Sequence, residues 1–406
     1  MTAVTAQRIT SADHAREVAA RLASEFALGA AERDRLRGLP FHEVERLAAS
    51  GLLAVTVPAA YGGADLAASE VAEVVRILAT ADPNIAQIPH SHFVYLNLLR
   101  LAGSEEQRRW YFTRVLDGAR IANAQSERGG ATVAEVRTTL KPLGDGRFRI
   151  DGSKFYCTGS LFADVLAALV RLDDPGADSG LAPGEYIAYL PADTSGVEIL
   201  DDWNALGQRT TGSGSVRFDG VLVTADQLVE RSGAVRAPTG YGAFAQLLHV
   251  AIDAGIARGA LTAATEFVRT RSRPWFEAGV ERAIDDPLTI QRFGELAVAV
   301  VTAEATLTAA GLAVDAATIP DPGPEAAAAA SLAVATAKIV ADRAADEVAS
   351  ALFEVGGTRS AAADLNLDHF WRNARTHTLH DPVRWKFQHI GRAVLHGTPP
   401  PLHGVI

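Results

Sequence analysis

Residues 373–382 run Asn-Ala-Arg-Thr-His-Thr-Leu-His-Asp-Pro, a stretch that follows a helical pattern and ends at a proline. It gathers Arg375, His377, His380 and Asp381 close together. His377 and His380 are three residues apart, so they share one face of a helical turn. A cation near a helix C-terminus interacts favourably with the helix dipole, which accounts for one of these residues but not for the group. The stretch therefore predicts a polar functional site beside an apolar helical bundle.

The composition limits the classes of protein to consider. The chain has 406 residues, enough for two or three domains, and its net charge of −10 argues against a nucleic-acid partner. Cys157 is the only cysteine, so no intrachain disulfide can form. Residues 1–20 lack the apolar core of a signal peptide, and no run of about 18 apolar residues is free of charge. We expect a cytoplasmic protein that spans no membrane.

Three successive patterns divide the chain. Residues 1–119 show helical periodicity, residues 120–232 alternate apolar and polar positions with frequent glycine, and residues 233–406 return to helical periodicity. We expect three domains with these bounds. The fold class is then α+β, with a central β barrel or sandwich between an N-terminal helical domain and a C-terminal helical bundle, and a cleft where they meet.

Local signals predict individual elements. Ser104 and Gln107 have the spacing of a capping box at the start of a helix. Residues 31–50 predict one helix, and Asp151-Gly152 predicts a tight turn between two strands. The longest late helices are expected at residues 246–270, 287–317, 324–355 and 368–380.

Several motifs follow one another as in the acyl-CoA dehydrogenase superfamily, and this resemblance covers nearly the whole chain. They are GLLAVTVPAAYGG (51–63), GSEEQ (103–107), NAQSE (123–127), DGSKFYCTG (151–159), DDWNALGQRTTGSGS (201–215), RTRSRPW (269–275), FEVGGTR (353–359) and NARTHTLHDP (373–382). Within the superfamily, the motifs at 201–215, 269–275 and 373–382 resemble the flavin-dependent monooxygenase branch. That branch includes the dibenzothiophene monooxygenases and the sulfur-acquisition oxidoreductases, and the resemblance implies the superfamily's fold.

The resemblance also implies a reaction. Members of this branch are two-component monooxygenases, in which reduced flavin and O₂ form a flavin hydroperoxide that oxygenates a small apolar substrate, here expected to be an organosulfur compound. A dehydrogenase needs a carboxylate base, whereas His377 and His380 offer imidazoles, which donate hydrogen bonds near neutral pH. No G-x-G-x-x-G motif opens a βαβ unit, so we expect a separate flavin reductase. The resemblance favours FMN as the cofactor, and FAD stays open.

The resemblance assigns catalytic roles to three residues. His92 matches the family's active-site histidine, and His380 matches the late one. We expect both to flank the flavin hydroperoxide, donating hydrogen bonds to it and protonating the departing hydroxide. A second interpretation stays open, in which His90, not His92, faces the site, or both histidines only cap the helix. Thr158 matches a family serine that hydrogen-bonds near the flavin nitrogen protonated on reduction.

The resemblance also implies a cofactor site. Asn123, Ser126 and Thr158 occupy positions that meet the edge of the flavin ring with an amide and hydroxyls. Arg273 is the candidate for the flavin phosphate, because a guanidinium grips phosphate through two parallel hydrogen bonds. In the family this arginine reaches a flavin bound mainly by a neighbouring subunit, which implies a homo-oligomer, usually a homotetramer.

The late polar stretch adds two cofactor candidates. Arg375 either pairs with phosphate or forms a salt bridge, and the sequence does not decide between these roles. His377 is expected to support the cofactor loop or His380 from behind. Because no second cluster of ligand residues accompanies the two histidines, we expect no metal site.

Trp203 and Ser215 are the candidates for lining the substrate site, although core packing is the alternative for Trp203. Two other functions remain: an acyl-CoA dehydrogenase with tightly bound FAD, and a flavin-binding relative without catalysis. The lack of a free late carboxylate argues against the first, and the histidine pair argues against the second. Cys157 is expected to be a small buried residue.

Overall fold

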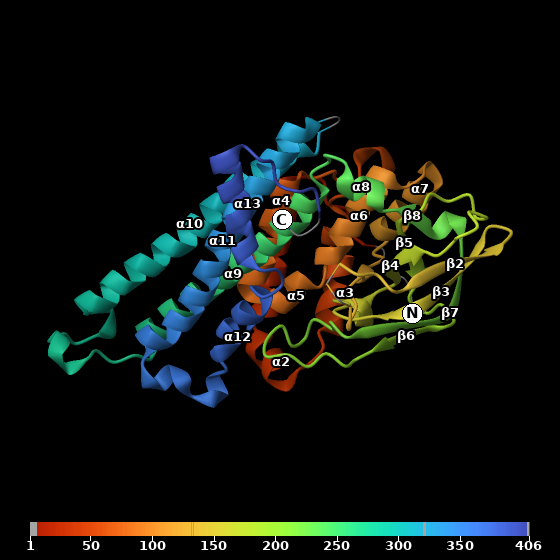
Figure 1. Cartoon of the computed structure of the whole chain (residues 1–406). Helices are drawn as coiled ribbons and strands as arrows, with labels where there is room; N and C mark the ends of the chain where they lie inside the picture. The colour runs from red at the N-terminus through yellow and green to blue at the C-terminus, as the bar shows by residue number, and fades with distance from the viewer. Residues whose placement is uncertain (1–5, 131, 133, 320–321, 404–405) are drawn as a thin grey trace.

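The computed structural model describes residues 6–130, 132, 134–319, 322–403 and 406. Helices precede a β sheet and follow it, and the two halves of the molecule lie side by side, with the sheet on the right and the long late helices on the left in Figure 1. The predicted α+β order is confirmed. The proposed division at residue 119 falls between α7 and β1, and the one at residue 232 falls on the first residue of α8; whether the three parts are separate domains stays a prediction.

The N-terminal part consists of seven α-helices among the residues that the structure describes. These are α1 (Ala12–Ala27), α2 (Ala30–Leu36), α3 (Phe41–Ala49), α4 (Ala68–Ala81), α5 (Pro83–Gln87), α6 (His90–Ala102) and α7 (Glu105–Leu116). The predicted capping box of Ser104 and Gln107 begins α7. The single helix predicted for residues 31–50 is wrong: α2 and α3 are separate, because Pro40 lacks an N–H group and disfavours helix at the preceding residue.

The central part is one mixed sheet in the order β6-β7-β3-β2-β4-β5-β8, with β1 paired to β4. Its strands are β1 (Ile121–Ala124), β2 (Thr139–Gly144), β3 (Arg147–Lys154), β4 (Val165–Leu172), β5 (Glu185–Pro191), β6 (Val197–Leu200), β7 (Ser215–Thr224) and β8 (Leu228–Glu230). β4 runs parallel to β1 and β2, and the other pairs are antiparallel. Apolar residues of the strands form a core of their own, which includes Cys157, buried as predicted.

The tight turn predicted at Asp151-Gly152 is wrong. β3 continues through both residues, and the chain reverses earlier, at Asp145-Gly146. The register of β3 against β7 shifts between Ile150 and Gly152, so the glycine marks a bulge. A side chain at Gly152 would also collide with Thr138.

The C-terminal part is built around α9, which is buried on nearly every side. The late helices are α8 (Ser232–Arg236), α9 (Tyr241–Thr270), α10 (Pro287–Ala317), α11 (Gly323–Gly356), α12 (Asp368–His377) and α13 (Val383–His396). Short 3-10 segments lie at Leu52–Ala54, Ala59–Tyr61, Ser160–Phe162, Ala225–Gln227, Phe276–Ala278, Ala283–Asp285, Thr358–Ala361 and Ala363–Leu365. Gly255 lets α9 approach α4 closely, since a Cβ atom there would lie 2.5 Å from the Cβ atom of Ala79.

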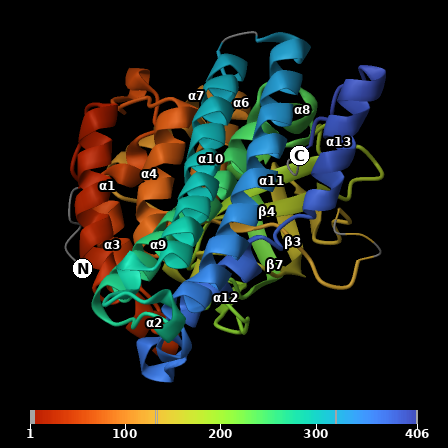
Figure 2. The same ribbon diagram turned by 90° about the vertical axis from the view of Figure 1, so that its left-hand side faces the viewer.

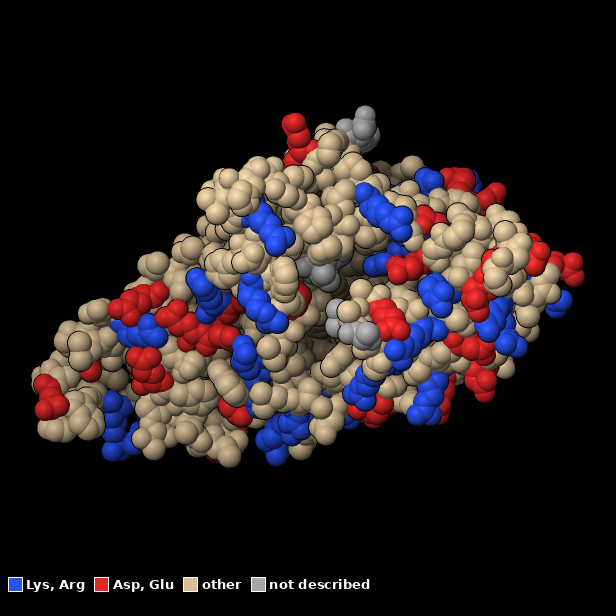
Figure 3. All heavy atoms as spheres, in the orientation of Figure 1, with Lys and Arg blue, Asp and Glu red and all other residues tan. Residues whose placement is uncertain are grey.

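By length and composition alone, α9, α10 and α11 could each cross a membrane. The most apolar window of α9 is 83% buried within the fold, whereas that of α10 is only 33% buried. Figure 2 shows α10 on the outside of the helical half. On the face drawn in Figure 3, acidic and basic side chains are interspersed over both halves. The outer side of α10 is therefore an apolar surface without a partner in the single chain.

Candidate active site

The site predicted from residues 373–382 lies where the sheet meets the helices. A Cβ atom on Gly159, in the loop after β3, would lie 3.1 Å from the carbonyl oxygen of Ile88, just before α6. The N–H group of Gln208, in the loop before β7, donates to Oδ1 of Asn373 on α12 at 2.7 Å. Loops of the sheet thus contact the start of α6 and the face of α12 that carries the predicted histidines.

Four histidines gather at this junction. His90 begins α6, His249 lies in α9, His377 ends α12 and His380 follows it. The ring centroid of His249 lies 4.0 Å from that of His90, 3.9 Å from that of His380 and 5.1 Å from that of His377. Burial lowers the pKa of His90 to about 3 and that of His249 well below its ordinary value, so both rings are neutral at physiological pH.

His377 is held from behind by α9. Its Nδ1 atom lies 2.5 Å from Oδ1 of Asp253, and its Nε2 atom lies 3.0 Å from Nδ1 of His249. Both ring nitrogens are therefore engaged inside the protein, which leaves neither for direct contact with a cofactor. Its predicted support of His380 or of the cofactor loop stays a prediction. Among the residues that the structure describes, no group of these side chains is arranged to hold a metal ion.

His249 and Asp253 were not predicted from the sequence. They are one helical turn apart in the otherwise apolar run Leu247–Ile256, and two titratable residues at that spacing in a buried helix are a signal that could have found them. Their partner His377 lies 128 positions from His249, so the contact itself has no local trace in the sequence.

His380 is oriented by the only acid of the late stretch. Its Nδ1 atom lies 3.2 Å from Oδ1 of Asp381, whose other oxygen pairs with the ammonium group of Lys386 at 2.7 Å. Burial opposes ionisation of Asp381, but the hydrogen bond from His380 and the charge of Lys386 outweigh it and lower the pKa of this carboxyl group. Asp381 is thus a fixed anion, and the Nε2 side of the half-exposed His380 is left for a ligand.

His92 and His90 have different surroundings. The Nδ1 atom of His92 accepts from the N–H group of Ile121 at 3.0 Å, and its Nε2 atom donates to the carbonyl oxygen of Leu53 at 2.8 Å. The ring is 1% exposed, and burial lowers its pKa to about 4. Because both nitrogens of His92 bond to the backbone, the geometry favours the second interpretation, in which His90 faces the site and His92 ties α6 to β1.

On the sheet side, two of the predicted residues carry polar atoms suited to a ligand. Asn123 donates from Nδ2 to the carbonyl oxygen of Tyr156 at 3.4 Å, while its Oδ1 atom is buried and has no partner among the described residues. The Thr158 hydroxyl lies 2.7 Å from that of Ser213, which lies 2.6 Å from that of Thr211. Ser213 and Thr211 were not predicted, although they stand within the motif at 201–215.

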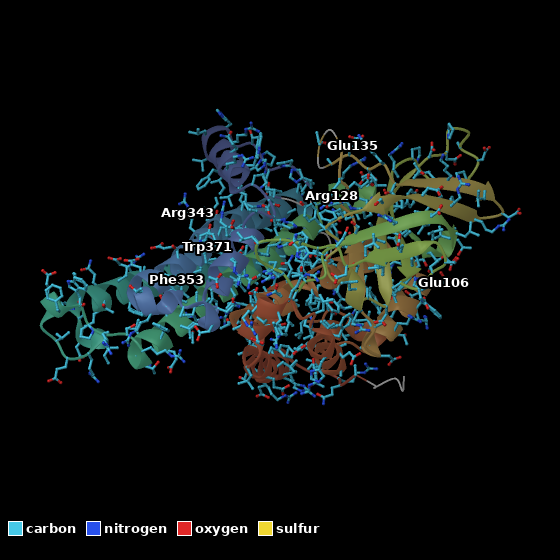
Figure 4. All side chains as sticks on the ribbon, turned by 90° about the horizontal axis from the view of Figure 1, so that it is seen from below. Glu106, Arg128, Glu135, Arg343, Phe353 and Trp371 are labelled. Atoms are coloured by element: carbon cyan, nitrogen blue, oxygen red, sulfur yellow. The ribbon has the colours of Figure 1, made fainter. Side chains whose placement is uncertain are left out.

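Tyr156 stands beside these polar atoms in a strained conformation. Its φ of 59° is rare for a residue with a bulky side chain and marks a position that the surrounding structure enforces. Its ring is half-exposed and packs edge-on against Trp203, with centroids 5.8 Å apart. Arg128 lies over the neighbouring ring of Phe155, and Figure 4 shows Arg128 where the sheet half meets the helical half. Trp203 therefore belongs to an aromatic cluster at the junction.

The two predicted serines are placed less favourably. The Ser215 hydroxyl donates to Oδ2 of Asp202 at 2.7 Å, which engages it at the start of β7. The carbonyl oxygen of Ser126 accepts from the N–H group of Phe155 at 2.8 Å, which fixes its backbone beside the aromatic cluster.

The two predicted phosphate-binding arginines lie apart from each other. Arg375 forms an ion pair with Asp346 on α11 at 3.2 Å, so within one chain it has the salt-bridge role that the sequence left open. Arg273 is exposed on the segment between α9 and α10, just after the C-terminal end of α9. His249 of the histidine cluster lies near the N-terminal end of the same helix. A role for Arg273 at a flavin would therefore require the flavin of a second copy.

Comparison with known proteins agrees with this geometry. Residues 10–119 match the model of the acyl-CoA dehydrogenase N-terminal domain, and residues 247–385 match that of the C-terminal domain. The chain is 34% identical to dibenzothiophene monooxygenase of Rhodococcus qingshengii, over 94% of this chain and 93% of that protein. It is 32% identical to the probable FMNH2-dependent monooxygenase SfnC of Pseudomonas putida, over 94% and 95%. The crystal structure of FMN-bound TdsC from Paenibacillus sp. A11-2 superposes with a TM-score of 0.91 at 35% identity, covering 97% of this chain and 100% of that chain.

Proposed function

Since this chain belongs to the acyl-CoA dehydrogenase family and, within it, to the branch of dibenzothiophene monooxygenase, we propose that it is a monooxygenase that uses reduced FMN. It transfers one oxygen atom of O₂ to a small apolar organosulfur substrate. The other oxygen atom leaves as water.

One observation at the junction carries this proposal. The late position that would need a free carboxylate in a dehydrogenase holds His380, and the adjacent Asp381 is fixed by Lys386. An ionised, ion-paired carboxylate is a poor base, whereas imidazoles can donate hydrogen bonds and protons. The site therefore offers no free carboxylate to remove a carbon-bound proton, whereas a protonated His380 can donate a proton to a developing oxygen anion.

The sheet side of the junction fits a flavin ring. The unpartnered Oδ1 atom of Asn123 is an acceptor for a ring N–H group, and the Thr158 hydroxyl can donate to or accept from a ring nitrogen. Tyr156 and Trp203 offer apolar surface beside them. Reduced FMN, when bound, supplies two electrons and the position at which O₂ is activated.

We assign the proton transfers of the reaction to the imidazoles of His380 and His90. His380, oriented through its Nδ1 atom by Asp381, presents its Nε2 side to the reacting oxygen atoms. The neutral ring of His90 donates from its Nε2 atom to the carbonyl oxygen of Ala245 at 2.9 Å, so its Nδ1 atom is an acceptor in the proposed reaction. His92 fixes the start of β1 next to Asn123. Buried apolar residues of α6 and α9 behind the rings keep bulk water away.

Assembly, reductase and location are further parts of the proposal. Exposed Arg273 and the apolar outer side of α10 support a homotetramer, in which a neighbouring copy covers α10 and Arg273 reaches that copy's flavin phosphate. A separate, diffusible reductase supplies the reduced FMN. The cytoplasm is the proposed location, and fractionation of cells that express the protein tests it.

The function is tested by supplying reduced FMN from a generic reductase to the purified protein with a panel of organosulfur compounds. We expect an oxygenated product and little hydrogen peroxide. The His380→Ala variant should convert most of the reduced FMN to hydrogen peroxide, while the His42→Gln variant, which changes an exposed histidine on α3, should behave as the wild type. Purification with tightly bound FAD that bleaches with an acyl-CoA would instead establish a dehydrogenase.

A further inference from the structure

A line of three buried side chains leads from the core of the helical half to the centre of the histidine cluster. Asp253 and His249 are one turn apart on α9, and His377 of α12 joins them through contacts of 2.5 Å and 3.0 Å. Asp253, His249 and His377 are 0%, 1% and 3% exposed. Such a line in the dry interior is unusual for a helix whose other buried residues, apart from Gln246, are apolar or glycine.

The contact between Asp253 and Lys338, at the inner end of the line, decides which ring nitrogens of His377 and His249 carry a hydrogen. Lys338 of α11 lies 3.0 Å from Oδ2 of Asp253 and also contacts Asp342. The charge of this ammonium group favours the ionised form of Asp253 in the resting protein, and an ionised carboxylate only accepts. The Nδ1 atom of His377 must then carry the hydrogen, so the Nε2 atom of the neutral ring accepts from Nδ1 of His249. The Nε2 atom of His249 is consequently left with a lone pair.

That lone pair is the open end of the line. The Nε2 atom of His249 is buried and has no hydrogen-bond partner among the described residues. An unpaired buried polar atom destabilises a fold, so we expect this atom to meet a ligand, a water molecule or a proton in the working protein. The His249 ring lies between those of His90 and His380, the two imidazoles assigned to the reacting oxygen atoms.

We propose that Asp253, His377 and His249 form a proton relay whose outer atom, Nε2 of His249, exchanges a proton with the groups that react between His90 and His380. When a proton binds this atom, the Nδ1 hydrogen of His249 passes to Nε2 of His377. The Nδ1 hydrogen of His377 then passes to Oδ1 of Asp253. Two N–H bonds break and two form, one O–H bond forms, and one proton has moved from the site to the carboxyl group.

The relay has a definite task in the proposed reaction, on which this inference rests. Reduced FMN, O₂ and substrate yield FMN, oxygenated product and water, so two hydrogens of the reduced cofactor end in the water. The relay holds one of these protons until the water forms and then returns it through His249. His249 is thereby a further catalytic residue, and Asp253 and His377 are positioning residues.

The surrounding charges suit temporary storage of a proton. Burial raises the pKa of Asp253, although the charge of Lys338 opposes this shift, so the carboxyl group can hold a proton without being a strong acid. Burial also lowers the pKa of His377 well below its ordinary value, and the charge of Lys338 adds to this effect. The other titratable groups around the line are Asp342, His90, His380 and Asp381. Both shifts favour a proton on the carboxyl group of Asp253 over one on the imidazole of His377.

The first test needs no turnover. Neutron diffraction from deuterated crystals of the wild-type protein should show deuterium on Nδ1 of His249 and on Nδ1 of His377, and none on Nε2 of His249. Deuterium on Nε2 of His249, with Nδ1 as an acceptor, would reverse the line and overturn the relay. Since this test measures proton positions in the resting protein, it stands even if the proposed oxygenation fails.

The second test breaks the relay without removing its hydrogen bonds. In Asp253→Asn the amide oxygen still accepts from His377, and in His377→Gln the amide can donate to Asp253 and accept from His249, but neither residue can pass a proton. We expect product formation about 100-fold slower in both, with the dissociation constant of FMN changed by no more than about threefold. The exposed Asp145→Asn change is the matched control. Wild-type rates in either folded variant would overturn the relay.

Discussion

At the scale of single residues, the backbone partners of a histidine decide its role more than its place in the sequence does. His90 and His92 are two positions apart, yet one joins the cluster with His249 and the other has both nitrogens bonded to Leu53 and Ile121. The sequence alone does not decide which of the two histidines faces the site, because the answer depends on the exact residue at which α6 begins. The fixed tautomer of His92 makes it a connector between helix and sheet.

Replacing each of the two histidines by alanine should separate these roles. His90→Ala should shift the products from oxygenated substrate towards hydrogen peroxide with little loss of stability, since His90 bonds to the backbone only through Ala245. His92→Ala leaves a buried N–H group and a buried carbonyl oxygen without partners, which should lower the free energy of unfolding by about 2–5 kcal/mol. Urea unfolding and peroxide assays measure both effects. A stable His92→Ala protein that makes only peroxide would contradict this assignment.

The buried imidazoles should also make the fold sensitive to acid. Folding lowers the pKa of His90 to about 3 and of His92 to about 4, against about 6.5 in the unfolded chain. Below pH 6.5 the unfolded chain therefore binds protons that the folded chain does not, and stability falls as the pH falls. Each of these histidines should lower the free energy of unfolding by roughly 2 kcal/mol between pH 6.5 and 5.

The contribution of one ring to this acid sensitivity can be measured with His92→Asn, whose amide can still donate to Leu53 and accept from Ile121. Its stability, followed by urea unfolding at several pH values, should depend less steeply on pH than that of the wild type. The exposed His42→Gln control should keep the wild-type slope. Equal slopes in all three proteins would show that His92 titrates normally.

At the scale of elements, α9 determines how the helical half is packed. A Cβ atom on Gly255 would lie 2.5 Å from the Cβ atom of Ala79 and 2.7 Å from the carbonyl oxygen of Arg76, so α4 and α9 approach closely at this point. The same helix carries His249, which lies in the histidine cluster, and Asp253 one turn further along. Its packing against α4 thus sets the position of the proposed relay.

Gly255→Ala tests this close contact. Alanine favours a helix over glycine by about 1 kcal/mol, but backbone of α4 would have to move, so we expect a net loss of about 1–3 kcal/mol. The matched control is Gly294→Ala on α10, where a Cβ atom meets nothing within 4 Å and a gain of up to about 1 kcal/mol is expected. Chemical denaturation measures both. Equal effects of the two substitutions would rule out the close approach.

The elements themselves could largely be predicted, whereas the site could be predicted only in part. The periodicity and the capping residues of α10 and α11 are local, and their predicted bounds agree with the structure to within a residue. The tight turn predicted at Asp151-Gly152 was wrong because a glycine in a bulge and a glycine in a turn have the same sequence signal. His249 and Asp253 were missed because their partners stand on distant segments.

At the scale of the whole molecule, the single chain leaves one side of the helical half uncovered. Val298, Val301 and Leu312 are more than half exposed and share one face of α10, so the helix presents an apolar stripe to solvent. A second copy of the chain is the proposed cover. Assembly would also bring Arg273 of one copy to the site of another, which connects the quaternary structure to flavin binding.

Replacing both Val301 and Leu312 by glutamate should disrupt this assembly, because two charges would have to be buried at the contact. Light scattering after gel filtration should give about four times the mass of the chain for the wild type and a smaller mass for the variant, with weaker FMN binding. Leu28→Glu, at a lone leucine that is 91% exposed, should keep the wild-type mass. A monomeric wild type that binds FMN tightly would contradict the proposed assembly.

The central claim is that this chain splits O₂ and places one of its atoms on an organosulfur substrate. The most direct measurement is mass spectrometry of the product after turnover with reduced FMN under ¹⁸O₂ in ordinary water. The account predicts one ¹⁸O atom in each molecule of product, and the His380→Ala variant should give less of this product and more labelled hydrogen peroxide. A product without ¹⁸O, or reoxidation of the flavin with no product from any organosulfur compound, would contradict it.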